Sequence, residues 1–362
     1  MKTVFFEIEN WENESLAALC RNLDFEVVKT PLSSENAGHY ASAEIISCFI
    51  YSRLDRTVLE KFRNLKLIAT RSTGYDHIDI DYCNEKSIAI ANVPAYGSHT
   101  VAEHVFALLL ALSRHLRQAL QQTREGNFHL RGLQGFDLYG KTMGIIGTGF
   151  IGMRTAEIAK GFGMNVLAHD IHPHMDAARQ VGFTYTSLDR LLAQADVISL
   201  HVPATRSTNH LLSEREFGLM KDGIILINTA RGTNIDVKAL LAALANGKVG
   251  GVGLDVLPDE PSIREEAELL RASFAKDHDL ETLLVDNALL HHKKVIVTPH
   301  SAFYTKEAVE RILETTSDNI RAFQDGIPLH IVNRPVSAGD RQKNETDFSG
   351  RSGDSDRIPV SS

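Results

Sequence analysis

Short apolar runs alternate with helical patterns in the N-terminal part of the chain. Strands are predicted at Thr3–Ile8, Ala43–Ile50 and Leu67–Thr70, and a helix is predicted at Arg56–Phe62. Strands that alternate with helices favour a parallel sheet, because parallel neighbours need a crossover connection. Residues 1–98 are therefore expected to form an α/β domain.

A second series of strands begins after a turn-rich stretch from Gly126 to Gly140. Helices are predicted within it at Ile151–Phe162 and Asp236–Asn246. Its strand candidates are short apolar runs, namely Thr142–Ile146, Asn165–His169, Asp196–His201, Gly223–Asn228, Gly250–Asp255 and Lys294–Val297. This alternation predicts a second α/β sheet.

A long amphipathic helix is predicted between the two series, from Val101 to Thr123. Its apolar residues recur at helical spacing, at Leu108, Leu109, Leu112 and Leu116. Such a face fits either a core or interdomain contact or a dimer contact, and the pattern alone leaves both open. Another helix is expected at Thr305–Asp325.

The length of 362 residues fits two domains. Lys and Arg number 38 against 46 Asp and Glu, which gives a net charge of −8. A dedicated nucleic-acid binder would show a basic stripe, so no nucleic-acid partner is expected. The longest apolar run, Val105–Leu112, is too short to span a bilayer, so no membrane partner is expected.

The three cysteines, Cys20, Cys48 and Cys83, form no CxxC pair, and this spacing argues against a disulfide framework or a structural zinc site. Together with an N-terminus that lacks the pattern of a signal peptide, this favours a cytoplasmic protein. The cluster of His169, His172 and His174 is broken by a proline and is interpreted as surface histidines, so no metal is expected.

A glycine-rich turn with the pattern GxGxxG follows an apolar strand and opens a helix, at Gly147, Gly149 and Gly152. The first glycine permits the tight turn, the second lets the backbone approach a pyrophosphate, and the third allows close packing of helix and strand. The N–H groups around Phe150 and Ile151 would face the phosphates. This context predicts a dinucleotide site.

The next strand ends at Asp170. A carboxylate at this place accepts hydrogen bonds from the adenosine ribose and repels a ribose phosphate, so NAD is predicted rather than NADP.

Three residues with complementary chemistry follow predicted strands: Arg231, Glu260 and His300. In an open α/β sheet the ligand crevice lies at the carboxyl ends of the strands. A guanidinium grips a carboxylate through two hydrogen bonds, and a histidine paired with a carboxylate gives a proton to a developing alkoxide. The three residues are the predicted catalytic set for hydride transfer to a keto carbon.

The chain resembles the D-isomer-specific 2-hydroxyacid dehydrogenase family over about residues 1–335. The motifs that carry the resemblance are Asn92–Tyr96, Val101–His104, Gly147–Gly152, Leu200–Pro203, Asn228–Gly232, Leu254–Val256 and Thr298–His300. The resemblance implies that Arg231 binds the substrate carboxylate and carbonyl, that His300 is the acid/base, and that Glu260 supports His300. Arg231 and His300 would also border the cofactor.

Further roles follow from the same resemblance. Asp255 would hold the nicotinamide carboxamide. The cofactor site would also be lined by Val202, Pro203, Thr208, Thr229 and Ala230. The loop Arg71–Gly74 matches the family's carboxylate-binding loop, in which backbone N–H groups of Thr73 and Gly74 contact the substrate.

Two aromatic residues resemble the D-lactate dehydrogenase branch of the family. Tyr96 would reach the substrate, and Phe303, in the stretch Ser301–Thr305, would form an apolar wall for a small side chain; core packing is the alternative for both. The segment Pro261–Lys294 departs from the branch, since it is long and highly charged. It is expected to be a solvated segment or a cover that alters substrate choice.

The resemblance implies two doubly wound parallel-sheet domains, one Rossmann-like and one flavodoxin-like. The substrate domain would comprise residues 1–98 and 299–335, with the NAD-binding domain, 99–298, inserted into it. The polar residues 336–362 are expected to be a disordered tail. A homodimer through the cofactor domain is also implied.

The predicted function is NAD-dependent reduction of a small 2-keto acid, pyruvate first, to the D-2-hydroxy acid. Phenylpyruvate, glyoxylate or hydroxypyruvate, 3-phosphoglycerate and phosphite remain alternative substrates of a related dehydrogenase. A corepressor-like protein that senses NAD without catalysis is a further alternative.

Overall fold

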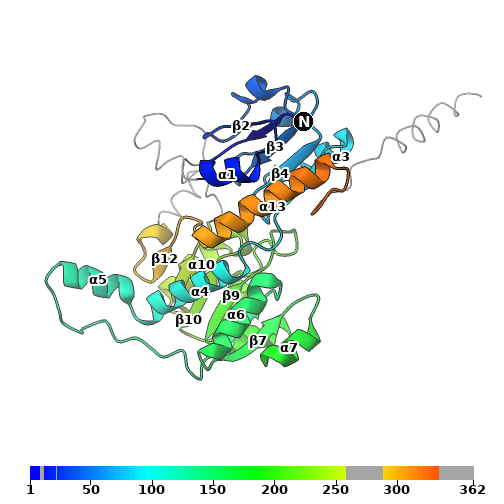
Figure 1. Cartoon of the computed structure of the whole chain (residues 1–362). Helices are drawn as coiled ribbons and strands as arrows, with labels where there is room; N and C mark the ends of the chain where they lie inside the picture. Colours follow the sequence, from blue (N-terminus) through cyan, green and yellow to red (C-terminus); the bar gives the residue numbers. More distant parts are fainter. Residues whose placement is uncertain (9–11, 22, 258–287, 334–362) are drawn as a thin grey trace, which may run out of the picture. The chain divides into compact units, whose positions relative to one another are not determined.

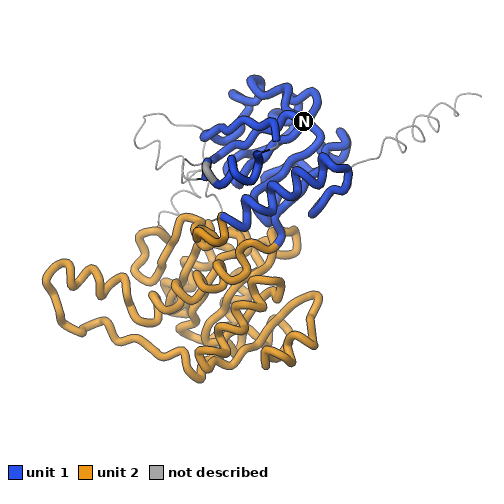
Figure 2. Tube along the Cα trace, viewed as in Figure 1, with its two compact units in different colours: residues 1–94, 310–362 blue, residues 95–309 orange. Residues whose placement is uncertain are grey.

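The computed structural model describes residues 1–8, 12–21, 23–257 and 288–333. The chain divides into two compact units (Figure 2). Unit 1 comprises residues 1–94 and 310–362, and unit 2 comprises residues 95–309. Unit 2 is thus inserted into unit 1 along the sequence.

Unit 1 contains a five-stranded parallel sheet in the order β2-β1-β3-β4-β5. This is the flavodoxin-like order, in which the strand order reverses between β1 and β3. The strands are β1 (Thr3–Phe5), β2 (Phe25–Val27), β3 (Ile45–Cys48), β4 (Leu67–Thr70) and β5 (Ala89–Ala91). The helices are α1 (Asn13–Leu19), η1 (Ala37–Tyr40), α2 (Arg56–Leu59), α3 (Ile80–Lys86) and α13 (Lys306–Gln324), which carries the chain back from unit 2.

The strands of unit 1 are buried on both faces, as expected for parallel strands covered by helices. One core packs Ile46 and Ile68 of the sheet against Val58 of α2 and Cys83 of α3. On α13, Ser317 lies 3.9 Å from the Cys20 sulfur that follows α1. Apolar burial of this kind supplies most of the stability of such a layer.

Unit 2 contains a seven-stranded parallel sheet in the order β12-β11-β10-β9-β6-β7-β8. Counted from β6, this is the Rossmann order. The strands are β6 (Thr142–Ile146), β7 (Asn165–His169), β8 (Thr184–Tyr185), β9 (Val197–Leu200), β10 (Ile224–Asn228), β11 (Val249–Leu254) and β12 (Val295–Val297). The helices are α4 (Ser98–Ser113), α5 (Leu116–Arg124), α6 (Phe150–Gly161), α7 (Met175–Val181), α8 (Leu188–Gln194), α9 (Glu214–Leu219), η2 (Gly232–Asn234) and α10 (Val237–Ala245).

Helices cover both faces of the unit 2 sheet, and side-chain alternation along each strand sends neighbours to opposite cores. On β10, Leu226 packs in the core formed with α8, α9 and α10. Ile225 and Ile227 pack in the other core, with α4 and α6. Figure 1 shows α4 and α6 together on one side of this sheet. The predicted fold class, two parallel α/β sheets with one domain inserted into the other, is confirmed.

The predicted helix Val101–Thr123 is wrong as one continuous element. The structure has α4 and α5 instead, with the backbone at His115 in the left-handed region at φ 49°. The break has a physical cause: the carbonyl of Ser113 accepts a hydrogen bond from Phe136 N–H at 3.0 Å, and the His115 ring lies 3.1 Å from the Gln134 carbonyl. The returning chain thus competes for the groups that would continue the helix.

The other predicted strands and helices are present: β4, β6 and β7 have the predicted bounds, β11 and α6 begin and end one residue earlier, and the rest are shorter than predicted. The helices α1, α3, α7, α8 and α9 and the strands β2, β5 and β8 were not predicted. These strands have two or three residues each, too few for a periodic pattern. The predicted tail at 336–362 and most of the segment Pro261–Lys294 lie outside the described residues. In the part of the chain that the structure describes, no helix is long and apolar enough to cross a membrane.

Candidate functional site: a dinucleotide turn beside an acid/base loop

The glycine-rich turn joins β6 to α6 and is shaped by close backbone approach. Gly147 has φ 92°, and a Cβ there would lie 2.6 Å from the carbonyl oxygen of His201. A Cβ at Gly152 would overlap the carbonyl oxygen of Gly147. Only glycine fits these two positions, since a side chain at the first would also be strained. The predicted reasons for the first and third glycines therefore match the geometry.

The turn leaves room where a pyrophosphate is expected. A Cβ added at Gly149 would meet no atom within 4 Å, so this glycine borders open space. Gly149 is also the residue before α6, whose first residues, Phe150 and Ile151, leave N–H groups at the helix N-terminus. A second sign comes from Thr229 after β10, whose buried hydroxyl has no hydrogen-bond partner among the described residues. These features fit a bound NAD.

Asp170 follows β7 and is held beside the turn. Its Oδ2 accepts hydrogen bonds from Thr148 N–H at 2.6 Å and from the Thr148 hydroxyl at 2.9 Å, and its Oδ1 accepts one from His172 N–H at 2.8 Å. Burial alone would raise the pKa of Asp170, but these hydrogen bonds outweigh it and lower the pKa. The carboxylate is therefore ionised at neutral pH and aimed by the turn itself.

The loop after β9 carries three further predicted cofactor residues: Val202, Pro203 and Thr208. The Thr208 hydroxyl donates to the Pro203 carbonyl at 2.5 Å and lies 2.8 Å from Thr205 N–H. The buried Asn234 amide donates to the Thr208 carbonyl at 3.0 Å. Asn234 thereby ties this loop to the turn that carries Arg231.

Arg231 and its neighbours Thr229 and Ala230 follow β10 in a turn that is fixed by two buried asparagines. Asn228 Oδ1 accepts from Ala230 N–H at 3.0 Å, and Asn228 Nδ2 donates to the Arg231 carbonyl at 2.9 Å. Asn234 Oδ1 accepts from Arg231 N–H at 3.2 Å. The guanidinium is half-buried, and its Nη1 donates to the Ala230 carbonyl at 2.8 Å.

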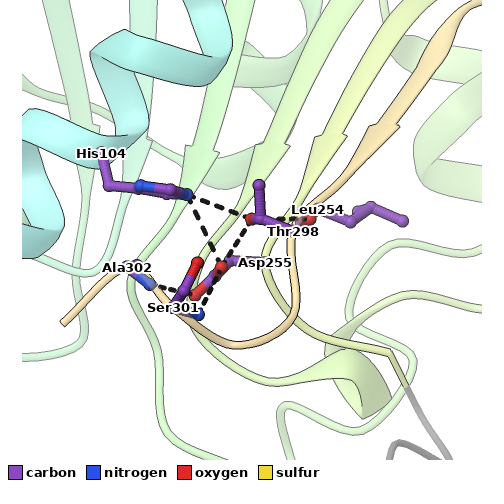
Figure 3. Close-up of polar contacts among 6 residues, drawn as sticks. All are labelled: His104, Leu254, Asp255, Thr298, Ser301 and Ala302. Atoms are coloured by element: carbon purple, nitrogen blue, oxygen red, sulfur yellow. Dashed lines mark hydrogen bonds and ion pairs between the residues drawn. The ribbon is translucent and has the colours of Figure 1, made fainter. Parts of the chain in front are cut away.

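The loop that carries His300 is held by Asp255, and Figure 3 shows the hydrogen bonds to Asp255 from Ser301 and Ala302, the two residues after His300. The backbone of His300 itself has φ 50°, an uncommon value for a residue with a side chain. His300 N–H donates to the Asp255 carbonyl at 3.0 Å, and the Asp255 carboxylate accepts from Ser301 N–H and Ala302 N–H, each at 2.9 Å. This set of hydrogen bonds opposes the strain and fixes the direction in which the loop presents His300.

Asp255 has a carboxylate that is 1% exposed and is used by the chain itself. Besides the two loop N–H groups, Oδ1 accepts from the Thr298 hydroxyl at 2.5 Å. Among the described residues, Oδ2 accepts a hydrogen bond from Ala302 N–H, and a carboxylate oxygen can accept more than one. The predicted contact to a nicotinamide carboxamide therefore stays a prediction.

Tyr96 and Phe303, predicted as substrate residues, are brought together. Their ring centroids lie 6.2 Å apart with an interplanar angle of 90°, an edge-to-face contact. Burial raises the pKa of Tyr96 to about 12, although the Arg231 guanidinium acts to lower it. The phenol therefore stays protonated at any working pH and is a hydrogen-bond donor near a fixed positive charge.

The predicted carboxylate-binding loop belongs to unit 1 and follows β4. The Thr73 hydroxyl donates to the Val93 carbonyl at 2.8 Å, and Asn92 Nδ2 donates to the Thr73 carbonyl at 2.8 Å. No described residue accepts a hydrogen bond from the N–H groups of Thr73 and Gly74. Consecutive N–H groups of this kind suit an anion.

Arg71, in the same motif, serves the fold instead. Its guanidinium is 2% exposed and donates to the carbonyls of Phe6 and Glu7 at 2.8 and 2.9 Å.

Glu260, the predicted partner of His300, lies outside the described residues, and its role stays a prediction. In the described part of the chain, no cluster of His, Cys, Asp and Glu could hold a metal ion.

Sequence reasoning missed the residues that hold the site in shape: Asn228, Asn234, Thr298 and His104. Asn228 and Thr298 stand inside the quoted motifs beside Arg231 and His300, so their position was a usable signal. The only sequence signal for Asn234 was its position three residues after Arg231. His104 lies in one of the quoted motifs, but nothing in the sequence indicated its partner.

Comparisons with known proteins agree with this geometry. Residues 106–302 match the family model described as D-isomer specific 2-hydroxyacid dehydrogenase, NAD binding domain. The D-lactate dehydrogenase of Escherichia coli (strain K12) is 36% identical over 330 residues, which cover 90% of this chain and 98% of that protein. A glyoxylate reductase from Korarchaeum cryptofilum is 33% identical over 336 residues and covers 91% of each chain.

Among solved structures, the D-lactate dehydrogenase of Aquifex aeolicus complexed with NAD and lactic acid superposes with a TM-score of 0.81. It is 39% identical, and the match covers 90% of this chain and 96% of that one. The predicted cofactor, NAD, is confirmed at the level of the family. The chain belongs to the D-isomer-specific 2-hydroxyacid dehydrogenases, a family of NAD-dependent oxidoreductases.

Proposed function

We propose that this enzyme reduces pyruvate to D-lactate with NADH. The observation that carries the proposal is the edge-to-face pair of Tyr96 and Phe303 with Arg231 close enough to act on the tyrosine pKa. Two aromatic rings beside a guanidinium suit a carboxylate with a small apolar substituent. The similarity to two D-lactate dehydrogenases supports the same choice.

The reaction assigns complementary tasks to the chain's own residues. Arg231 binds the substrate carboxylate and keto oxygen, and the protonated Tyr96 phenol donates a further hydrogen bond. Bound NADH supplies a hydride to the keto carbon and is oxidised to NAD⁺. His300 gives its proton to the keto oxygen as negative charge grows there, so the product is the neutral hydroxyl.

Other residues hold the substrate-binding and proton-transferring groups in position. Asp255 fixes the backbone on both sides of the His300 peptide, and the asparagines Asn228 and Asn234 fix the Arg231 turn. Thr73 and Gly74 keep their proposed role of binding the substrate carboxylate through backbone N–H groups. Asp170 selects NADH by its charge, because a ribose phosphate would lie against an ionised carboxylate. Glu260 is proposed to support His300 as its carboxylate partner.

Glyoxylate is the second candidate substrate. Glyoxylate reductases from two archaea are among the relatives, at 33% and 34% identity. Glyoxylate lacks the methyl group of pyruvate and therefore gains less from an aromatic wall. At about 0.8 kcal/mol per buried carbon group, a filled pocket would favour pyruvate by a few-fold to tenfold in kcat/KM.

A substrate panel tests the proposal. NADH oxidation is followed with pyruvate, glyoxylate, hydroxypyruvate and phenylpyruvate, each with NADH and with NADPH, and the lactate formed is resolved by chirality. Pyruvate with NADH is expected to give the highest kcat/KM and D-lactate alone. A higher value for glyoxylate or phenylpyruvate would refute pyruvate as the substrate, and L-lactate would refute the stereochemical assignment.

We also propose a homodimer that forms in the cytoplasm. The apolar residues of α4 are largely used inside unit 2, whereas α5 and the extended chain after it project from the sheet (Figure 1). This arm exposes Leu116, Leu120, Phe128, Leu130 and Tyr139. The three cysteines are free and buried, which suits a reducing compartment. Sedimentation at equilibrium is expected to give twice the monomer mass, and a monomer would refute the dimer.

A further inference from the structure

His104 on α4 lies beside the loop that carries His300, here called the acid/base loop. No role has been assigned to His104 so far. Its side chain is 22% exposed. Its Nε2 lies 3.1 Å from the Thr298 hydroxyl and 3.5 Å from Oδ1 of Asp255 (Figure 3). Both neighbours belong to the set of hydrogen bonds that holds the backbone at His300. His104 therefore contacts the loop from helix α4.

The direction of these hydrogen bonds follows from counting hydrogens. The Thr298 hydroxyl has one hydrogen and lies 2.5 Å from Oδ1 of Asp255, a carboxylate oxygen that can only accept. The hydroxyl hydrogen is therefore given to Asp255. Nε2 of His104 must then carry a hydrogen and donate it to the Thr298 oxygen, with Asp255 Oδ1 within reach of the same N–H.

The buried carboxylate of Asp255 needs these donors. It is 1% exposed, and an ionised group out of water is stable only when hydrogen bonds replace hydration. Ser301 N–H and the Thr298 hydroxyl donate to Oδ1, which His104 Nε2 also approaches, and Ala302 N–H donates to Oδ2. If His104 no longer fixes Thr298 and Asp255, the N–H groups that follow His300 lose a fixed acceptor.

We propose that His104 is a positioning residue for the acid/base loop: by donating to Thr298 and Asp255 it holds the backbone around His300 in its left-handed conformation. The inference rests on the proposed role of His300 in proton transfer. A role as a mere packing group of α4 is the competing explanation. Helix α4 already buries Val105, Leu108 and Leu109 at 3% exposure or less, so its attachment to the sheet has other sources.

Two substitutions separate the two explanations. His104→Leu removes the donor and keeps the bulk, whereas His104→Gln places an amide N–H near the position of Nε2. His104→Leu is expected to lower kcat by tenfold to a hundredfold, the loss that a small misplacement of a catalytic group produces, with the NADH KM changed less than twofold. His104→Gln is expected to recover most of kcat, and His99→Leu, at an exposed position on the same helix, is the matched control.

A readout without substrate tests the same point. Amide hydrogen exchange is measured by mass spectrometry on peptides that cover residues 299–305 in the ligand-free protein. Exchange is expected to be at least tenfold faster in His104→Leu than in the wild-type protein, and unchanged in His104→Gln and His99→Leu. Faster exchange in a protein that reduces no keto acid would refute the proposed function and leave the positioning role intact.

The proposal is overturned by any of three results. The first is wild-type kcat in His104→Leu. The second is a loss in His104→Leu that His104→Gln fails to reverse although it folds. The third is unchanged exchange at residues 299–305 in His104→Leu.

Discussion

The carboxylate of Asp255 accepts the backbone N–H of Ser301 at 2.9 Å, one residue beyond the histidine proposed to transfer the proton. The same residue's carbonyl accepts His300 N–H at 3.0 Å. Asp255 therefore accepts hydrogen bonds from the backbone N–H groups of His300 and of the residue after it. These bonds hold His300 at a φ of 50°, a strained value that needs such support. Asp255 thus fixes the backbone that carries the proposed proton donor.

Replacement of this carboxylate is expected to damage catalysis more than folding. Asp255→Asn turns one acceptor oxygen into a donor that faces other donors, so kcat should fall by about a hundredfold or more and the free energy of unfolding by about 2 kcal/mol. Steady-state kinetics and urea unfolding measure the two effects. Asp196→Asn is the control, because Asp196 accepts from Thr142 N–H at 2.8 Å at the opposite end of the sheet. Equal loss of kcat in both variants would contradict the role of Asp255.

Cofactor preference is expected to depend on Asp170. Asp170→Ala removes the charge that repels a ribose phosphate, so the ratio of kcat/KM for NADPH to that for NADH should rise by tenfold or more. Part of the change comes from weaker NADH binding, because the contact with the ribose is lost as well. The ratio is measured with one keto acid and both cofactors. An unchanged ratio would refute the ribose role.

The carboxylate-binding loop should depend on Asn92, which donates to the Thr73 carbonyl and whose own carbonyl accepts from Asn319 at 2.9 Å. Asn92→Ala is expected to raise the KM for the keto acid by about tenfold, with a smaller effect on kcat, because the loop N–H groups lose their fixed direction. Asn333→Ala is the matched control, since Asn333 accepts from Ile90 N–H at 2.8 Å on β5, the strand that Asn92 directly follows. A similar rise of KM in the control would indicate general damage to unit 1.

Stability should fall in mild acid because of His201. Burial lowers the pKa of this histidine to about 3 from its ordinary value of 6.5. Below pH 6.5 the unfolded chain takes up a proton that the folded chain refuses, so the stability present above pH 6.5 is lost as pH falls toward 3, by up to about 1.4 kcal/mol per pH unit. His201→Gln should flatten this slope in urea unfolding at several pH values. His129→Gln, at an exposed position, should keep it.

The sequence predicted the parts of the molecule whose signals are local. The order of strands and helices follows from apolar periodicity, and Gly147, Gly149 and Gly152 follow from the backbone demands of a turn. The contact between Tyr96 and Phe303 was not available from periodicity, because the two residues are far apart in the chain and either could have been core. The resemblance to a family, not the pattern, singled them out.

The network under His300 was beyond sequence reasoning for a different reason. His104, Asp255 and Thr298 come from a helix, a strand end and a loop, and only the folded sheet brings them together. The break at His115 was also hidden, because the carbonyl of Ser113 is claimed by Phe136, a competitor that no local pattern reveals. Both the network at His300 and the helix break at His115 depend on hydrogen bonds between residues far apart in the sequence.

The central claim is that His300 supplies the proton to the keto oxygen, and His300→Gln tests it most directly. The measurement is kcat for pyruvate reduction by NADH in this variant and in the wild-type protein, together with the Kd for NADH from fluorescence titration. The account predicts a fall in kcat of about a thousandfold with Kd changed less than threefold, since general acid catalysis contributes about 10²–10⁴-fold. Full activity in His300→Gln would contradict it.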